Sequence, residues 1–183
     1  MAGHADREMP LPEFDEPPRI LIVIAAYYGD ISDAQLAAAR AVLDEAGAEH
    51  ETMEVPGSLE IPTAIGIAHR QGAFDGYVAL GCVIRGRTSH YDIVVNESAR
   101  AIATLGLAGA CIGNGIITVE NMAQAEERAD AARLDTAGAA AQAALHLVAL
   151  QRRIARAPKG VGFKPAGSFE HDAAHAPDGP AVA

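Results

Sequence analysis

Apolar residues follow two alternating patterns along the middle of this chain. Continuous apolar runs rich in β-branched residues predict strands that are buried on both faces of a sheet, and stretches with helical spacing of apolar residues predict amphipathic helices. We expect strands at residues 19–26, 49–55, 76–84 and 109–119. We expect helices at residues 30–47, 59–72, 90–106, 120–133 and 136–156.

The order of these segments predicts a single α/β domain. Because strands that alternate with helices form a parallel sheet covered on both faces, we expect a three-layer αβα sandwich with a four-stranded parallel sheet and a flavodoxin-like arrangement. Gly47 is expected to end the first helix, and the glycines within 109–119 are expected to break the middle of the last strand. In such sheets, ligands bind in the loops beyond the carboxyl ends of the strands.

Prolines mark the ends of the folded unit. Eight of the ten prolines lie before Arg19 or after Arg156. We therefore expect residues 1–18 to form a flexible acidic N-terminal arm, residues 19–156 to form the folded domain, and residues 157–183 to form a loose tail rich in Ala, Pro and Gly.

The charge of the chain excludes several classes of partner. A net charge of −10 at pH 7 argues against nucleic acid and against an anionic membrane, because both require a cationic face. No apolar run approaches the ~20 residues that a membrane helix needs. The amino-terminal residues lack the basic start and apolar core of a signal peptide, so we expect a cytoplasmic location.

The two cysteines, Cys82 and Cys111, lie inside or at the end of apolar runs. Burial as small hydrophobic residues is favoured over a redox or catalytic role for both. They lack the paired spacing of a zinc site, and the seven histidines are scattered. We therefore expect no metal site.

The stretch "IRGRTSH", residues 84–90, follows the third predicted strand and carries concentrated positive charge in an acidic chain. A helix that begins near its end presents unpaired backbone N–H groups to an anion. Arginine charge, hydroxyl donors and a flexible glycine favour a phosphate site. The residues concerned are Arg85, Gly86, Arg87, Thr88 and Ser89.

A simpler interpretation of the same stretch is a capping box, with Ser89 as the N-cap and Asp92 three residues on. Capping does not explain the arginines or His90, so phosphate binding is favoured over capping alone. His90 is equally consistent with a surface residue and with a general acid/base. The sequence has no P-loop pattern of a nucleotide-binding protein.

Two other loops carry candidate binding residues. In "VPGSLEIP", Glu60 lies near a helix start, where it either stabilises the helix dipole or accepts hydrogen bonds from sugar or polyol hydroxyls. In "AAYYGD", Tyr27 and Tyr28 follow the first strand in a chain with few aromatic residues. One of them can belong to the core, but two in a ligand-binding loop favour a stacking wall for a flat heterocycle.

Three motifs, "VPGSLEIP", "GCVIRGRTSHYDIV" and "GNGIITVENMAQAEERA", occur in this order on the expected elements. Together they resemble the lumazine synthase family over roughly residues 19–154. The resemblance implies that the domain at 19–156 condenses 5-amino-6-(ribitylamino)pyrimidinedione with 3,4-dihydroxy-2-butanone 4-phosphate to 6,7-dimethyl-8-ribityllumazine, phosphate and water. It also implies small-molecule substrates, no metal or organic cofactor, and a homo-oligomer with active sites between neighbouring subunits.

The resemblance implies roles for residues that contact the pyrimidine. Tyr27 matches an aromatic ring that stacks on the heterocycle, and Asn114 matches a position that touches it from the adjacent subunit. Further contacts, through backbone and side chain, fall on the end of the third strand, at Cys82, Val83 and Ile84.

The resemblance also implies which residues bind the ribityl chain and the phosphate, and which residue transfers protons. His90 matches the histidine that transfers protons, and Arg128 matches an arginine that pairs with the phosphate. The turn expected to hold the ribityl chain comprises Ser58, Leu59 and Glu60. The loop expected to hold the phosphate comprises Gly86, Arg87 and Thr88.

The chain departs from the family pattern at three positions. Tyr28 and Asn114 replace a common asparagine and a common phenylalanine, and Thr136 stands where a lysine is usual near the phosphate. Arg85 or Arg87 is a candidate to compensate for that lysine. The Thr136 departure leaves an alternative, a catalytically weakened paralogue that acts as a flavin- or lumazine-binding assembly. The resemblance implies that the larger shells of the family need a short link between the last two helices. The link here is about one residue longer, which favours a pentamer or decamer over an icosahedral shell.

Overall fold

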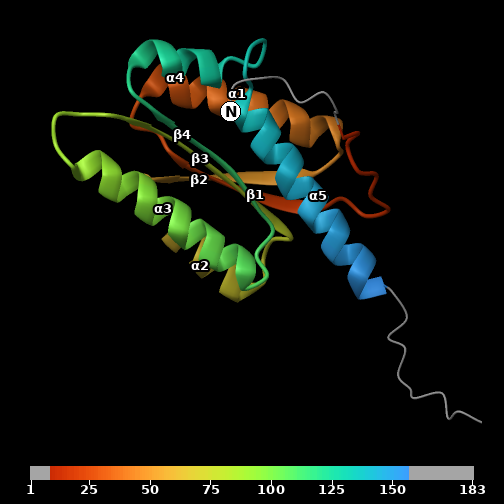
Figure 1. Cartoon of the computed structure of the whole chain (residues 1–183). Coiled ribbons are helices and arrows are strands. Elements are labelled where there is room, and N and C mark those ends of the chain that lie inside the picture. Colours follow the sequence, from red (N-terminus) through yellow and green to blue (C-terminus); the bar gives the residue numbers. More distant parts are fainter. Residues whose placement is uncertain (1–8, 157–183) are drawn as a thin grey trace, which may run out of the picture.

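The computed structural model describes residues 9–156, which form a sheet between two layers of helices (Figure 1). The strands are β1 (Arg19–Ala25), β2 (Glu49–Val55), β3 (Gly76–Ile84) and β4 (Ile112–Val119). The helices are α1 (Gly29–Glu45), α2 (Ile61–Gln71), α3 (His90–Leu107), α4 (Met122–Ala129) and α5 (Thr136–Arg156). Three layers and a four-stranded parallel sheet confirm the predicted α/β fold class.

The strand order is β2-β1-β3-β4, with every neighbouring pair parallel. The inner strand β1 is buried on both faces, because each side chain from Ile20 to Ala25 is at most 2 % exposed. This burial is what its continuous apolar run predicts.

The two faces of the sheet are covered by different helices. Helices α1 and α5 pack on one face, where Ile22, Leu43 and Leu145 belong to one buried cluster. Helices α2 and α3 pack on the other face, where Ile65 and Ile102 lie in a second cluster. Figure 1 shows α4 on the same side of the sheet as α1 and α5.

Strand β4 is continuous, so the expectation that its glycines break it was wrong. A Cβ atom on Gly113 would overlap the backbone carbonyl of Ala140, and one on Gly115 would lie 2.8 Å from Leu80 Cδ2. The glycines therefore serve packing, since they let α5 approach β4 more closely than any side chain would allow.

Two helix boundaries differ from the prediction. Helix α4 ends at Ala129 instead of residue 133, because Asp130 turns to an extended conformation and its carboxylate accepts a hydrogen bond from the Ala132 N–H at 2.8 Å. Helix α2 begins at Ile61, two residues later than expected. Helix α1 ends just before Gly47, as expected. Gly47 adopts a left-handed φ of +66°, the conformation with which a glycine commonly ends a helix.

Residues 9–18, the described part of the N-terminal arm, lie against the body of the domain. Leu11 and Phe14 pack on the cluster beneath α1 and α5, and Arg152 of α5 donates a hydrogen bond to the Glu16 carbonyl at 2.6 Å. Residues 1–8 of the arm that was expected at 1–18, and the expected tail at 157–183, lie outside the described residues. Among the helices of residues 9–156, none is long and apolar enough to cross a membrane.

Candidate active site

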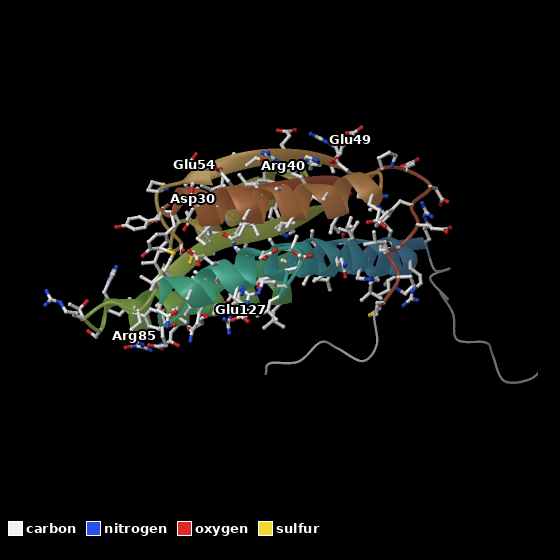
Figure 2. All side chains as sticks on the ribbon, turned by 90° about the horizontal axis from the view of Figure 1, so that it is seen from above. Asp30, Arg40, Glu49, Glu54, Arg85 and Glu127 are labelled. Atoms are coloured by element: carbon white, nitrogen blue, oxygen red, sulfur yellow. The ribbon has the colours of Figure 1, made fainter. Side chains whose placement is uncertain are left out.

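The carboxyl ends of the parallel strands lie at one end of the molecule. Figure 2 shows Glu54, near the end of β2, and Arg85, just beyond β3, at this end, while Glu49 at the start of β2 lies at the opposite end. The loops that were expected to bind a ligand therefore open on the same edge of the sheet.

The two tyrosines in the loop after β1 differ in how deeply they are buried. Tyr27 is 77 % exposed, whereas Tyr28 packs on the cluster that contains Ile31 and Cys82. Burial, with contributions from Cys82 and Tyr27, raises the pKa of the Tyr28 phenol above its usual value. The two rings meet edge to face with centroids 4.9 Å apart. Tyr28 thus supports Tyr27 from the core, and the Tyr27 ring is available for stacking.

The end of β3 directs successive side chains to opposite faces of the sheet. The Cys82 side chain is 7 % exposed and packs with Ile117 and Ala125 on the α1/α4 side. Burial raises the pKa of the Cys82 thiol to about 11, so the thiol is protonated near neutral pH. Ile84 also packs on this cluster. Of the three predicted pyrimidine contacts on β3, only the Val83 side chain points to the α2/α3 side, and Cys82 and Ile84 offer their backbone there.

The turn before α2 fits closely against β3. Ser58 is 8 % exposed, and a Cβ atom on Gly81 would lie only 3.0 Å from its Oγ. Glu60 is the N-cap residue of α2, where its carbonyl accepts a hydrogen bond from the Ala64 N–H at 2.9 Å. Its carboxylate is not used as a cap and the residue is exposed, which leaves it accessible to hydroxyl donors. Leu59 lies between them and is half-buried.

The loop before α3 does not form the capping box that was the simpler interpretation of its sequence. Ser89 occupies the N-cap position, but its side chain makes no capping hydrogen bond. Asp92 bonds to Arg85 instead. The Thr88 hydroxyl accepts a hydrogen bond from the His90 N–H at 3.4 Å. Residues 86–90 are all exposed, so the loop that leads into α3 is open to solvent.

The two arginines of this loop differ in their surroundings. Arg85 Nε lies 3.0 Å from a carboxylate oxygen of Glu120, and its Nη1 lies 3.1 Å from Asp92. The hydrogen bond with Glu120 is the main cause that raises the pKa of Arg85. Within residues 9–156, Arg87 is exposed and forms no ion pair. Of the two charges expected at the anion site, one is therefore neutralised by acidic partners.

Two further predicted residues lie on other elements. Asn114 is exposed on β4, where its Oδ1 accepts a hydrogen bond from the Ile116 N–H at 3.1 Å. Arg128 on α4 donates to the Gln124 carbonyl at 3.1 Å and lies 4.0 Å from Glu127. Within the described residues, no hydrogen bond or ion pair joins Arg128 to the 86–90 loop. Sequence pattern alone does not distinguish Arg128 from a surface charge on a helix, and only the family resemblance pointed to it.

One groove of the described surface lies between α1 and α4. It has a volume of about 720 Å³, is lined by helix residues such as Ala37, Ala41 and Met122 together with Tyr28, and includes none of the residues that the family resemblance assigns to substrate contacts. No cluster of three possible metal ligands occurs within residues 9–156. Most of the predicted residues lie in the loops at the carboxyl edge, whereas Asn114 lies nearer the start of β4 and Arg128 lies on α4.

This edge combines an exposed aromatic ring, an exposed carboxylate, a cationic loop at a helix start and a histidine on the first turn of that helix. Such an arrangement is typical of an α/β enzyme that binds an anionic small molecule and uses acid–base catalysis. The family model for 6,7-dimethyl-8-ribityllumazine synthase matches residues 17–152, and the chain belongs to this family.

Several relatives in other organisms carry the same family name. The chain is 69 % identical over 171 residues to the 6,7-dimethyl-8-ribityllumazine synthase of Jannaschia sp. (strain CCS1), covering 93 % of this chain and 96 % of that one. It is 53 % identical to that of Sphingopyxis alaskensis, covering 73 % and 95 %. It is 50 % identical to that of Bartonella tribocorum, covering 77 % and 95 %. The chain is a transferase of riboflavin biosynthesis that acts on small-molecule substrates, and its family is oligomeric.

Proposed function

We propose that this chain condenses 5-amino-6-(ribitylamino)pyrimidinedione with 3,4-dihydroxy-2-butanone 4-phosphate at the carboxyl edge of its sheet. The observation that carries the proposal is the open α2/α3 side of this edge, where Tyr27, Glu60, Val83 and His90 come from four successive segments of the chain. The products are 6,7-dimethyl-8-ribityllumazine, phosphate and water.

The pyrimidine and its ribityl chain occupy the side of the site near α2. The exposed Tyr27 ring stacks on the heterocycle, while the backbone of Cys82 and Ile84 and the side chain of Val83 line its edge. The ribityl hydroxyls donate to the Glu60 carboxylate and lie along the turn formed with Ser58 and Leu59. The tight fit of this turn against Gly81 supports the role, because a held turn loses little freedom on binding.

The phosphate of the second substrate lies on the 86–88 loop. Gly86 lets the ligand approach the backbone, Thr88 adds a hydroxyl, and Arg87 supplies a charge that no carboxylate within residues 9–156 neutralises. Arg128 adds a second cation from a neighbouring subunit.

His90 moves protons during the condensation. The amino group of the pyrimidine attacks the butanone carbonyl, and loss of water gives an imine. Phosphate then leaves by elimination, and after tautomerisation the ribitylamino nitrogen closes the ring with loss of water. Because the reactants are held stacked and aligned, most of the acceleration comes from proximity, and His90 supplies the acid–base part.

The site is completed by a second copy of the chain. Helix α3 buries only Ser98 and Ile102, while Ile93 and Leu107 are 53 % and 93 % exposed. Apolar exposure of this kind is typical of a subunit interface. Asn114 and Arg128 make no bond to the 86–90 loop of their own chain, which fits a contribution to a neighbour's site. We propose a pentamer or decamer in place of a larger shell; the expected cytoplasmic location remains a prediction.

An assay with both substrates tests the proposed function directly. Purified protein is mixed with the two substrates, and the absorbance and fluorescence of the lumazine product are followed. We expect steady product formation and stoichiometric release of phosphate. Binding of lumazine without turnover would instead support the non-catalytic assembly that the Thr136 departure suggested, although the 69 % identity to a named synthase favours the enzyme.

A further inference from the structure

Arg85 joins three elements at the carboxyl edge of the sheet. Its backbone N–H donates to the Val119 carbonyl at 2.9 Å, which extends the β3–β4 pairing by one bond. Its guanidinium bonds to Glu120, beyond the end of β4, at 3.0 Å and to Asp92, in the first turn of α3, at 3.1 Å. The guanidinium carbon also lies 4.0 Å from the centre of the Tyr91 ring, within the range of a cation–π contact.

The loop that follows Arg85 has little packing of its own. A Cβ atom on Gly86 would meet no other atom within 4 Å. Residues 87–90 are exposed, and within the described chain their side chains form a single hydrogen bond, from the His90 N–H to the Thr88 hydroxyl. An exposed loop without buried side chains is expected to sample several conformations unless its ends are fixed.

Arg85 fixes both ends of this loop. The residue itself precedes Gly86, and its partners Tyr91 and Asp92 directly follow His90. A planar guanidinium that bonds to two carboxylates has a defined orientation, which a lysine ammonium does not provide. Because both carboxylates offset its charge, we expect Arg85 to bind phosphate less strongly than Arg87.

We propose that Arg85 is a positioning residue that holds the 86–90 loop, and with it the His90 imidazole, in the conformation that receives the phosphorylated substrate. Arg85 acts through its bonds to Glu120, Asp92 and Tyr91 and does not itself contact the phosphate. This inference rests on the proposed function for its catalytic consequence, while the anchoring of the loop is a property of the protein without substrate.

Hydrogen exchange of the full chain without substrate tests the anchoring. In Arg85→Met, amide exchange at residues 86–90 should rise about tenfold, while exchange in β1 stays unchanged. The double variant Asp92→Asn with Glu120→Gln keeps Arg85 but weakens both ion pairs, and it should raise exchange in the same loop. Arg87→Met and the remote control Arg40→Met should leave loop exchange at the wild-type level.

Steady-state kinetics separates positioning from direct binding. Arg85→Met and the double variant should raise KM for the phosphorylated substrate and lower kcat, with kcat/KM falling about tenfold and KM for the pyrimidine unchanged. Arg87→Met should raise KM for the phosphorylated substrate alone.

Two results would overturn the inference. One is loop exchange that is unchanged in both Arg85→Met and the double variant. The other is a double variant with wild-type kinetics while Arg85→Met is impaired, because Arg85 would then act through its charge. Failure of the wild-type protein to form lumazine would overturn the proposed function instead, and the exchange experiment would still decide whether Arg85 anchors the loop.

Discussion

The two faces of the sheet differ at the carboxyl ends of β3 and β4. On the side of α1 and α4, Cys82, Ile117 and Val119 are between 1 % and 7 % exposed. On the side of α2 and α3, Thr118 near the carboxyl end of β4 and Asn114 closer to its start are exposed, and residues 90–97 of α3 include no buried side chain. Adjacent residues of one strand therefore serve different purposes, since one residue supports the fold while the next faces the proposed site.

The largest effect is expected from a pair of substitutions at neighbouring positions of β4. Gly113→Ala places a methyl group against the Ala140 carbonyl, which should lower the free energy of unfolding by about 3 kcal/mol, the upper part of the range for overpacking. Asn114→Ala, on the open face, should cost less than about 1 kcal/mol. Urea unfolding of both variants measures the difference. Equal losses would mean that the two faces are not distinct in packing.

The next largest effect concerns catalysis on the open face. His90→Ala should lower kcat about 10- to 100-fold, because proximity of the two substrates remains while the proton shuttle is lost. His50→Ala is the control, since His50 lies at the amino end of β2, where it pairs with Asp44. Lumazine formation under saturating substrates measures both. A His90→Ala enzyme at full rate would remove this residue from the mechanism.

A smaller effect is expected when Thr136 is replaced by lysine, the residue that is usual at this position in the family. Thr136→Lys should lower KM for the phosphorylated substrate about two- to fivefold, because the gain from a further cation beside Arg87 and Arg128 is partly offset by the unfavourable position of a positive charge at the start of α5. Ala139→Lys, at an exposed position farther along the same helix, should leave KM unchanged. A higher KM in Thr136→Lys would show that this position does not face the phosphate.

The smallest expected effect concerns the reactivity of Cys82, which is buried on the α1/α4 side of the sheet. Burial raises the pKa of Cys82 from 9.0 to about 11, so the folded state favours the protonated thiol. The protonated thiol therefore contributes to the free energy of unfolding in full below pH 9, and this contribution is lost as the pH rises through 11. In a Cys111→Ala background, alkylation should therefore rise with a midpoint near pH 11 in folded protein and near pH 9 in unfolded protein. Rapid alkylation of the folded protein at pH 9 would show that this face is open.

Much of the fold is encoded in local patterns of the sequence. The apolar run of β1 and the helical spacing of α1 predict their elements because burial follows directly from those patterns. The glycines of β4 misled the prediction, because the approach of α5 that requires them is a tertiary contact between distant residues. Tyr28 and Ser58 show the same limit, since only packing reveals that these two side chains are the buried ones in their loops, whereas the burial of Cys82 was predicted from its apolar surroundings.

The candidate site was less predictable than the fold. The cationic loop was visible because arginines, hydroxyls and a histidine cluster within a few residues. The partners of Arg85 were not, because Glu120 comes close only after β3 and β4 pair. Arg128 has no local signal, since in the proposed shared site its place is set by subunit assembly and not by neighbouring residues in the sequence.

Complementation between two weakened variants tests most directly whether the open face is completed by a second subunit. His90→Ala and Arg128→Ala are each assembled alone and also co-assembled in equal amounts, and lumazine formation is measured. If His90 and Arg128 of one site come from different chains, about a quarter of all sites in the co-assembled protein regain both residues and activity rises well above either variant. If activity stays at the average of the two variants, both residues act within one chain and the shared site is contradicted.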